Sequence, residues 1–180
     1  VDHSDSLGAA GRFGNGDVQW MTAGKGVLHS EMFPLLKEDK ENPLLLFQIW
    51  LNLPARSKMV TPHFKMLWRD SIPKIIKKDD NGKATQITLI AGKIEGVKAI
   101  DPAPDSWASD PENEVGIWLI KIEANASWSI PQAPKQVNRR IYFYQGDKVS
   151  LNDTELNREQ GASLQANIDV TLKNGDEEGH

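Results

Sequence analysis

Short apolar runs, broken by glycine, proline, asparagine and aspartate, constrain the fold of this chain more than any other feature. Residues 17–21 alternate between polar and apolar side chains and directly follow a turn cluster at residues 14–17. Runs of roughly 4–8 residues bounded by turn residues are typical of strands in sandwiches and barrels. The pattern therefore predicts an all-β fold.

The strongest predicted strand covers residues 43–53, which are apolar on both faces. One face carries Leu45, Phe47 and Ile49, and the other carries Leu46 and Trp50. Such a strand is expected to be buried on both sides, as between two packed sheets. Further strands are predicted at residues 27–32, 86–91, 115–123, 139–144, 148–151 and 167–173, and a hairpin turn at residues 79–83 with Asn81-Gly82 at its centre.

Two less regular stretches organise the chain. Residues 55–78 are expected to form an ordered connection with one helical turn, and residues 101–113, rich in proline, a surface loop. Strand-like runs lie on both sides of the connection. We therefore predict two β units, residues 1–78 and residues 79–180.

Composition excludes several classes of function. The chain has no cysteine, which excludes disulfides, zinc–thiolate sites and thiol nucleophiles. Its net charge is −4 and its basic residues are scattered, so no nucleic-acid surface is predicted. No apolar run approaches the ~20 residues that cross a bilayer, and the first residues do not resemble a signal peptide. We expect a cytoplasmic protein.

His29 and Glu31 form the most suggestive pair of side chains. Residues two apart on a strand point to the same face, so an imidazole and a carboxylate would share one space. This donor pair suits a divalent transition metal. The alternative is an ordinary ion pair at a half-exposed strand edge, and the pair alone leaves both open.

The sequence around this pair resembles the signature of the pirin family. The resemblance is carried by residues 2–8 and 16–32, and by Phe47-Gln48-Ile49-Trp50-Leu51-Asn52-Leu53-Pro54 with residues 58–62. Residues 130–131 and 141–146 are similar to second-barrel segments, but the match is specific only over residues 2–62.

The resemblance implies two tandem cupin (double-stranded β-helix, jelly-roll) barrels. Residues 1–78 would be the C-terminal part of a metal-binding N-terminal barrel with the connection. Residues 79–180 would be a metal-free second barrel without its last strands. Both barrels are thus expected to be incomplete in this chain.

The resemblance also implies one divalent metal ion, iron(II) first, with manganese, nickel, cobalt, copper and zinc as alternatives. The later ligand pair of the family maps onto His29 and Glu31. Its earlier His-x-His element is expected upstream of Val1, so the site would be incomplete here. We expect His3 to lie at the surface at a strand end and His63 to be structural or solvated in the irregular connection. Neither these two nor the terminal His180 is expected to be a ligand.

Two functions follow from the resemblance. One is a quercetin 2,3-dioxygenase that cleaves a flavonol with dioxygen, in which Glu31 is both ligand and base for the 3-hydroxyl proton. The other is a regulatory module that binds a protein partner, nuclear as well as cytoplasmic in a eukaryote. A metal-free structural cupin is a third reading. The following residues are predicted to be barrel core, with a substrate cavity as the alternative: Trp20, Met21, Phe47, Ile49, Trp50 and Trp118.

Overall fold

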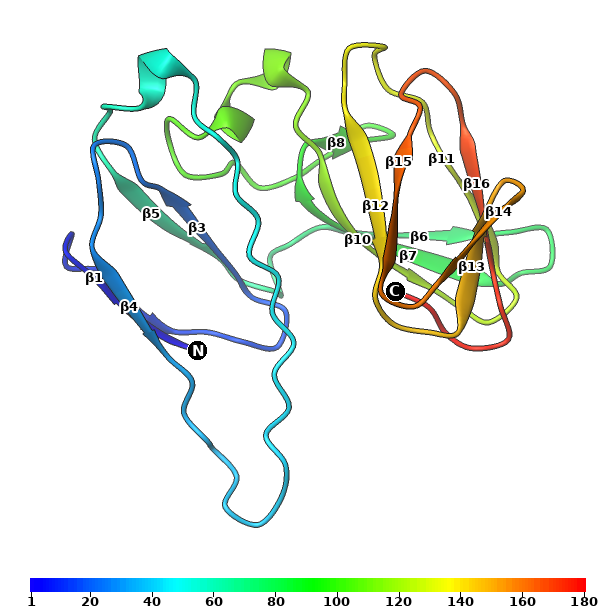
Figure 1. Cartoon of the computed structure of the whole chain (residues 1–180), viewed down its shortest axis with the longest axis horizontal. Coiled ribbons are helices and arrows are strands. Elements are labelled where there is room, and N and C mark those ends of the chain that lie inside the picture. Colours follow the sequence, from blue (N-terminus) through cyan, green and yellow to red (C-terminus); the bar gives the residue numbers. More distant parts are fainter. The chain divides into compact units, whose positions relative to one another are not determined.

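The computed structural model describes residues 1–180 and is all-β, which confirms the predicted fold class (Figure 1). It contains sixteen strands and three 3-10 helices of three residues each. None of its helices has the length and apolar character needed to span a membrane. The chain forms two compact units, residues 1–72 with 90–116, and residues 73–89 with 117–180. The division into two cupin barrels between residues 78 and 79 stays a prediction.

The first unit is built from small antiparallel sheets. A three-stranded sheet has the order β2-β1-β4, and two further pairs are β3-β5 and β8-β9. The elements of this unit are β1 (Asp2–Asp5), β2 (Ala10–Arg12), β3 (Val18–Thr22), β4 (His29–Met32), η1 (Ala55–Ser57), β5 (His63–Leu67), β8 (Lys93–Ile94), β9 (Val97–Lys98), η2 (Trp107–Ser109) and η3 (Pro111–Asn113).

The predicted surface loop at residues 101–113 is fastened to strand β3. The indole Nε1 of Trp20 donates to Ser106 Oγ at 3.0 Å, and Thr22 Oγ1 donates to the Pro104 carbonyl at 2.7 Å. Both Trp20 and Ser106 are buried, and so is Ala103 within the same loop. Buried polar groups require such partners, so these two bonds fix the loop on the strand.

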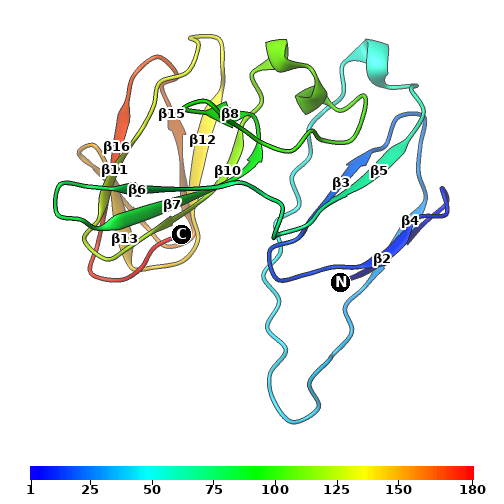
Figure 2. The ribbon, with the colours of Figure 1, turned by 180° about the vertical axis from the view of Figure 1, so that it is seen from behind.

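The second unit contains the remaining strands (Figure 2). They form a sheet of order β10-β7-β6, a sheet of order β11-β16-β13-β14 and the ribbon β12-β15. These strands are β6 (Lys74–Lys78), β7 (Ala84–Ala91, whose last two residues belong to the first unit), β10 (Ile117–Ile122), β11 (Ser127–Ile130), β12 (Arg139–Phe143), β13 (Lys148–Leu151), β14 (Thr154–Asn157), β15 (Gln160–Leu164) and β16 (Val170–Asn174).

The predicted hairpin turn joins β6 to β7 and is confirmed. Asp79 N donates to the Lys83 carbonyl at 3.0 Å, and Gly82 adopts φ +76°, a conformation that glycine takes without steric cost. The Asp79 carboxylate accepts from the backbone N–H groups of Asn81, Lys83 and Ser127. Desolvation opposes ionisation of Asp79, but these bonds outweigh it and lower the pKa of the carboxyl.

The predicted strand at residues 43–53 is wrong. This stretch has no strand structure, and its large side chains are exposed, Leu45 by 67% and Trp50 by 86%. A strand needs a neighbour for its backbone groups, and no strand of the first unit pairs with these residues. Phe47, Ile49 and Trp50 are therefore exposed rather than core, whereas Trp20 is buried as predicted.

The connection at residues 55–78 is more regular than predicted. It has the expected helical turn, η1, but it also contains all of β5 and β6. Lys65 in β5 and Lys74, Lys77 and Lys78 in β6 interrupt the apolar alternation, so the sequence pattern does not reveal either strand. The other predicted strands correspond to β3, β4, β7, β10, β12, β13 and β16.

Candidate functional site

The candidate site lies on the paired strands β1 and β4. These strands are antiparallel, with His3 opposite Glu31 and Asp5 opposite His29. Directly paired residues point to the same face of a sheet, and so do residues two apart on one strand. The pairing therefore places two imidazoles and two carboxylates on one face.

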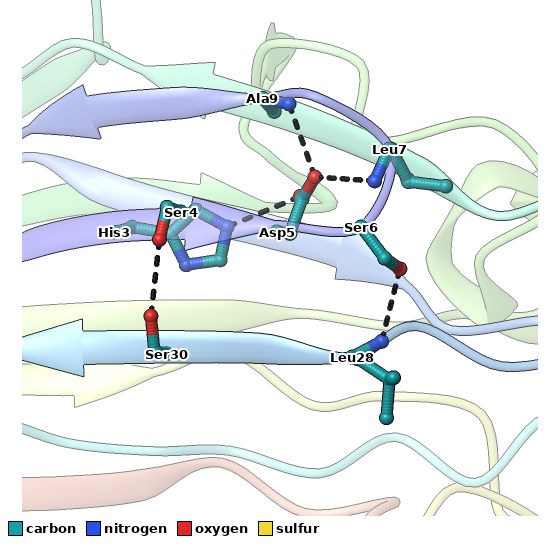
Figure 3. A network of polar contacts seen from close by, with 8 residues as sticks. All are labelled: His3, Ser4, Asp5, Ser6, Leu7, Ala9, Leu28 and Ser30. Carbon is teal, nitrogen blue, oxygen red and sulfur yellow. Dashed lines mark hydrogen bonds and ion pairs between the residues drawn. The ribbon is translucent and has the colours of Figure 1, made fainter.

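The opposite face of the same pair carries serines. Ser4 and Ser30 are paired, and their Oγ atoms lie 3.0 Å apart (Figure 3). At the end of the ladder, Ser6 Oγ accepts from Leu28 N at 3.1 Å and Ser6 N donates to the Leu28 carbonyl at 2.8 Å. These contacts fix the register in which β4 presents His29.

His3 lies inside the unit, so its predicted surface position is wrong. It is only 3% exposed, and its ring lies between two other rings. The ring centroids are 4.9 Å from Phe64, at an interplanar angle of 17°, and 5.6 Å from His29, at 30°. Phe64 comes from β5, a strand that the sequence did not reveal. Its ring covers His3, while His29 stays exposed and Glu31 half-buried.

Asp5 fixes the orientation of His3. Its Oδ2 lies 3.1 Å from His3 Nε2, and its Oδ1 accepts from Leu7 N at 2.9 Å and Ala9 N at 3.0 Å (Figure 3). Desolvation opposes ionisation of Asp5, but the bonds from His3, Leu7 and Ala9 outweigh it and lower the pKa of the carboxyl. We assign the His3 proton to Nε2, because an ionised carboxylate only accepts. His3 Nδ1 is buried and has no hydrogen-bond partner.

The connection from β3 to β4 depends on Gly24. This residue has φ +48°, and a Cβ atom there would clash with the Val60 carbonyl oxygen. The same oxygen accepts from Lys25 N at 3.0 Å. Only glycine allows the backbone to approach Val60 this closely.

His29 and Glu31 are suitable ligand types for a divalent metal, but two ligands are fewer than a stable site needs. His29 and Glu31 supply an imidazole and a carboxylate side by side, the donors that iron, manganese, nickel and zinc accept. However, the structure contains no group of three or more histidine, cysteine, aspartate or glutamate side chains that could hold an ion. Stable sites use three or more protein ligands, so the chain presents at most part of one.

Sequence reasoning missed His3 and Asp5 as members of this face. A signal for them exists, because His3-Ser4-Asp5 and His29-Ser30-Glu31 share one sequence motif, histidine–serine–acid. Each motif places its histidine and its acid on the same side of a strand. The antiparallel pairing of β1 and β4 then brings the two motifs together.

The remaining histidines lie elsewhere. His63 is the first residue of β5 rather than part of an irregular connection, and its Nε2 lies 3.3 Å from Asp105 Oδ2. Its side chain is 32% exposed. His180 Nε2 lies 3.6 Å from Glu178 Oε1 in the second unit. Neither belongs to the β1–β4 face.

Solved structures identify the class of this fold. A quercetin 2,3-dioxygenase from Acinetobacter baumannii superposes with a TM-score of 0.70 and 25% identity, over 99% of this chain and 58% of that one. A protein from Geobacillus kaustophilus gives a TM-score of 0.66 at 24% identity, over 99% of this chain and 66% of that one. The all-β architecture and this likeness show that the chain has a cupin-type fold.

Sequence comparisons point to similarity with one family. Residues 1–51 match the Pirin family model. The chain is 31% identical to a pirin-like protein of Arabidopsis thaliana, over 88% of this chain and 60% of that protein. It is 41% identical to a Pseudomonas aeruginosa protein whose name proposes a quercetin 2,3-dioxygenase, over 96% of this chain and 59% of that protein. The chain thus spans about three fifths of the length of these relatives.

Proposed function

We propose that this chain is the metal-binding part of a pirin-type bicupin that cleaves a flavonol with dioxygen. The observation that carries the proposal is the shared face of β4, on which His29 and Glu31 lie side by side within the segment matched to the pirin family. The names of relatives and structural neighbours add the reaction class. We propose the cytoplasm as the compartment.

His29 and Glu31 would hold one divalent ion, iron(II) before manganese, nickel, cobalt, copper or zinc. When bound, the ion would supply Lewis-acid polarisation of a substrate hydroxyl. Glu31 is half-buried and is proposed as the base that accepts the hydroxyl proton, because a carboxylate near its substrate can take up that proton. His29 would serve as a ligand, steadied by its stacking on His3.

Metal titration of matched variants tests the proposal. His29→Ala and Glu31→Gln each remove one donor, and we expect each to weaken binding of cobalt(II) or iron(II) by about 10-fold or more. Glu38→Gln is the control, since Glu38 is an exposed carboxylate outside β1 and β4. Anaerobic titration followed by elemental analysis measures binding, and loss of quercetin absorbance in air measures activity.

Two outcomes would count against the proposal. If His29→Ala and Glu31→Gln bind metal as the unmodified chain does, the ligands lie elsewhere. If metal binds with the expected dependence but quercetin persists, the metal site stands and the dioxygenase reaction fails.

A regulatory, protein-binding role is the second candidate, and one observation favours it. Residues 33–50 expose a run of large apolar side chains, and exposed apolar surface often marks a protein-binding site. These side chains are Phe33, Leu35, Leu36, Leu44, Leu45, Leu46, Phe47, Ile49 and Trp50. Leu45→Asp with Ile49→Asp would abolish partner binding while leaving metal binding by His29 and Glu31 unchanged. Loss of quercetin turnover with no effect on partner binding would instead favour the enzyme.

A further inference from the structure

The second unit contains a cavity that the proposed function does not use. It has a volume of about 440 Å³ and lies where β12 begins and β15 ends. In the ribbon, Arg139 pairs with Leu164 and Arg140 with Ser163. The cavity is lined by these four residues together with Val137 and Asn138. A volume of this order, roughly 300–1,000 Å³, is usual for small-molecule sites.

Arg139 has a hydrogen-bond donor without an acceptor. Its Nη1 donates to three carbonyls in the segment that follows β15, those of Ala166 at 2.9 Å, Ile168 at 3.2 Å and Gln165 at 3.3 Å. Its Nη2, by contrast, is shielded from water and has no partner. A buried cationic donor left unpaired is unfavourable, so each such group calls for an explanation.

The charge of Arg139 is also only weakly compensated. Burial lowers the pKa of its guanidinium, and Asp169 acts in the opposite direction through its charge alone. The Asp169 carboxylate is engaged by the backbone N–H of Gln132, at 3.0 Å. No residue of the cavity lining is acidic, whereas Arg139 and Arg140 are both cationic. In a chain of net charge −4, this lining is a local positive site.

We propose that this cavity binds a small organic carboxylate with an apolar body. The exposed guanidinium of Arg140 offers forked N–H donors, whose geometry matches a carboxylate, and Arg139 adds a second positive charge to the lining. The Ser163 hydroxyl and the Asn138 amide supply further polar contacts, and Val137 and Leu164 supply apolar walls. The site involves neither His29 nor Glu31, so it is independent of the proposed metal chemistry.

Benzoate and benzamide form a matched pair of probes. They share a ring and nearly the same shape, but only benzoate carries a negative charge. With the full chain labelled with ¹⁵N, we expect benzoate to shift the Arg139 Nε–Hε signal saturably, and benzamide to leave it unmoved. Arg139→Lys identifies that signal by its loss.

Charge variants test the site without disturbing the carbonyl contacts of Arg139. Arg140→Gln removes an exposed cation from the lining, and Arg158→Gln removes an exposed cation outside it. We expect Arg140→Gln to weaken benzoate binding about 10-fold, equivalent to about 1.4 kcal/mol, and Arg158→Gln to leave it unchanged. The proposal would be overturned if benzoate and benzamide bound equally, or if the two variants had equal effects. It would also be overturned if benzoate gave no saturable shift by about 10 mM, a Kd that corresponds to a binding free energy of about 2.7 kcal/mol.

Discussion

The hydrogen bond between Trp20 and Ser106 offers a direct test of how the loop at residues 101–113 is held. The indole N–H donates to Ser106 Oγ at 3.0 Å, and both residues are buried. Ser106→Ala removes the acceptor but leaves the indole N–H in place, shielded from water. Trp20→Phe removes the donor and leaves the serine hydroxyl, which still accepts from Ala108 N at 3.3 Å.

The expected magnitudes follow from this asymmetry. A buried donor left without an acceptor costs about 1–3 kcal/mol, so Ser106→Ala should lower the free energy of unfolding by about 2 kcal/mol. In the double variant, with Trp20→Phe, the indole N–H is absent and that penalty disappears. We therefore expect the double variant to be more stable than additivity predicts, with a coupling free energy of about 1–2 kcal/mol.

Urea unfolding followed by far-ultraviolet circular dichroism measures all four proteins of this cycle without relying on tryptophan fluorescence. Ser71→Ala, at an exposed serine in the same unit, is the control and should change stability by less than about 0.5 kcal/mol. Additivity of Ser106→Ala and Trp20→Phe within about 0.3 kcal/mol would refute the reasoning, because it would mean that the two side chains do not interact in solution.

Three further predictions concern the candidate site. His3→Ala should lower the free energy of unfolding by about 3 kcal/mol through the cavity it leaves. His3→Phe keeps the ring stack but leaves Asp5 Oδ2 without its partner, so urea unfolding should show a smaller loss of about 1–2 kcal/mol. Folding lowers the pKa of Asp5 from 3.8, so the ionised carboxylate stabilises the fold above that pH, and this stability is lost as pH falls through the lower folded pKa. Asp5→Asn should therefore weaken the decrease of the free energy of unfolding at acidic pH. An unchanged decrease would exclude the Asp5 carboxylate as its source. Gly24→Ala should lower the free energy of unfolding by more than about 2 kcal/mol, because φ is +48° and the new Cβ meets the Val60 carbonyl. Gly14→Ala, where the new Cβ would lie in open space, should lower it by less than about 1 kcal/mol. Similar values for the two variants would show that the β3–β4 connection relaxes freely.

The sequence determined what depends on neighbours along the chain. Period-two alternation and turn residues are local, and they predicted the all-β class, strand β3 and the turn at residues 79–83 correctly. The same period predicted that His29 and Glu31 share a face of one strand, as they do in β4. The resemblance to pirins likewise rested on contiguous sequence motifs, and the match to the family model supports it over residues 1–51.

Tertiary structure decided what depends on a partner far away in the chain. Residues 43–53 have a strong strand pattern, but a strand also needs a neighbour, and here the stretch has none and stays exposed. The burial of His3 depends on Phe64, and its approach to His29 depends on the register of β1 against β4. A one-residue slip of that register would turn His29 to the opposite face. Only the observed pairing of β1 with β4 therefore brings the two histidine–serine–acid motifs together.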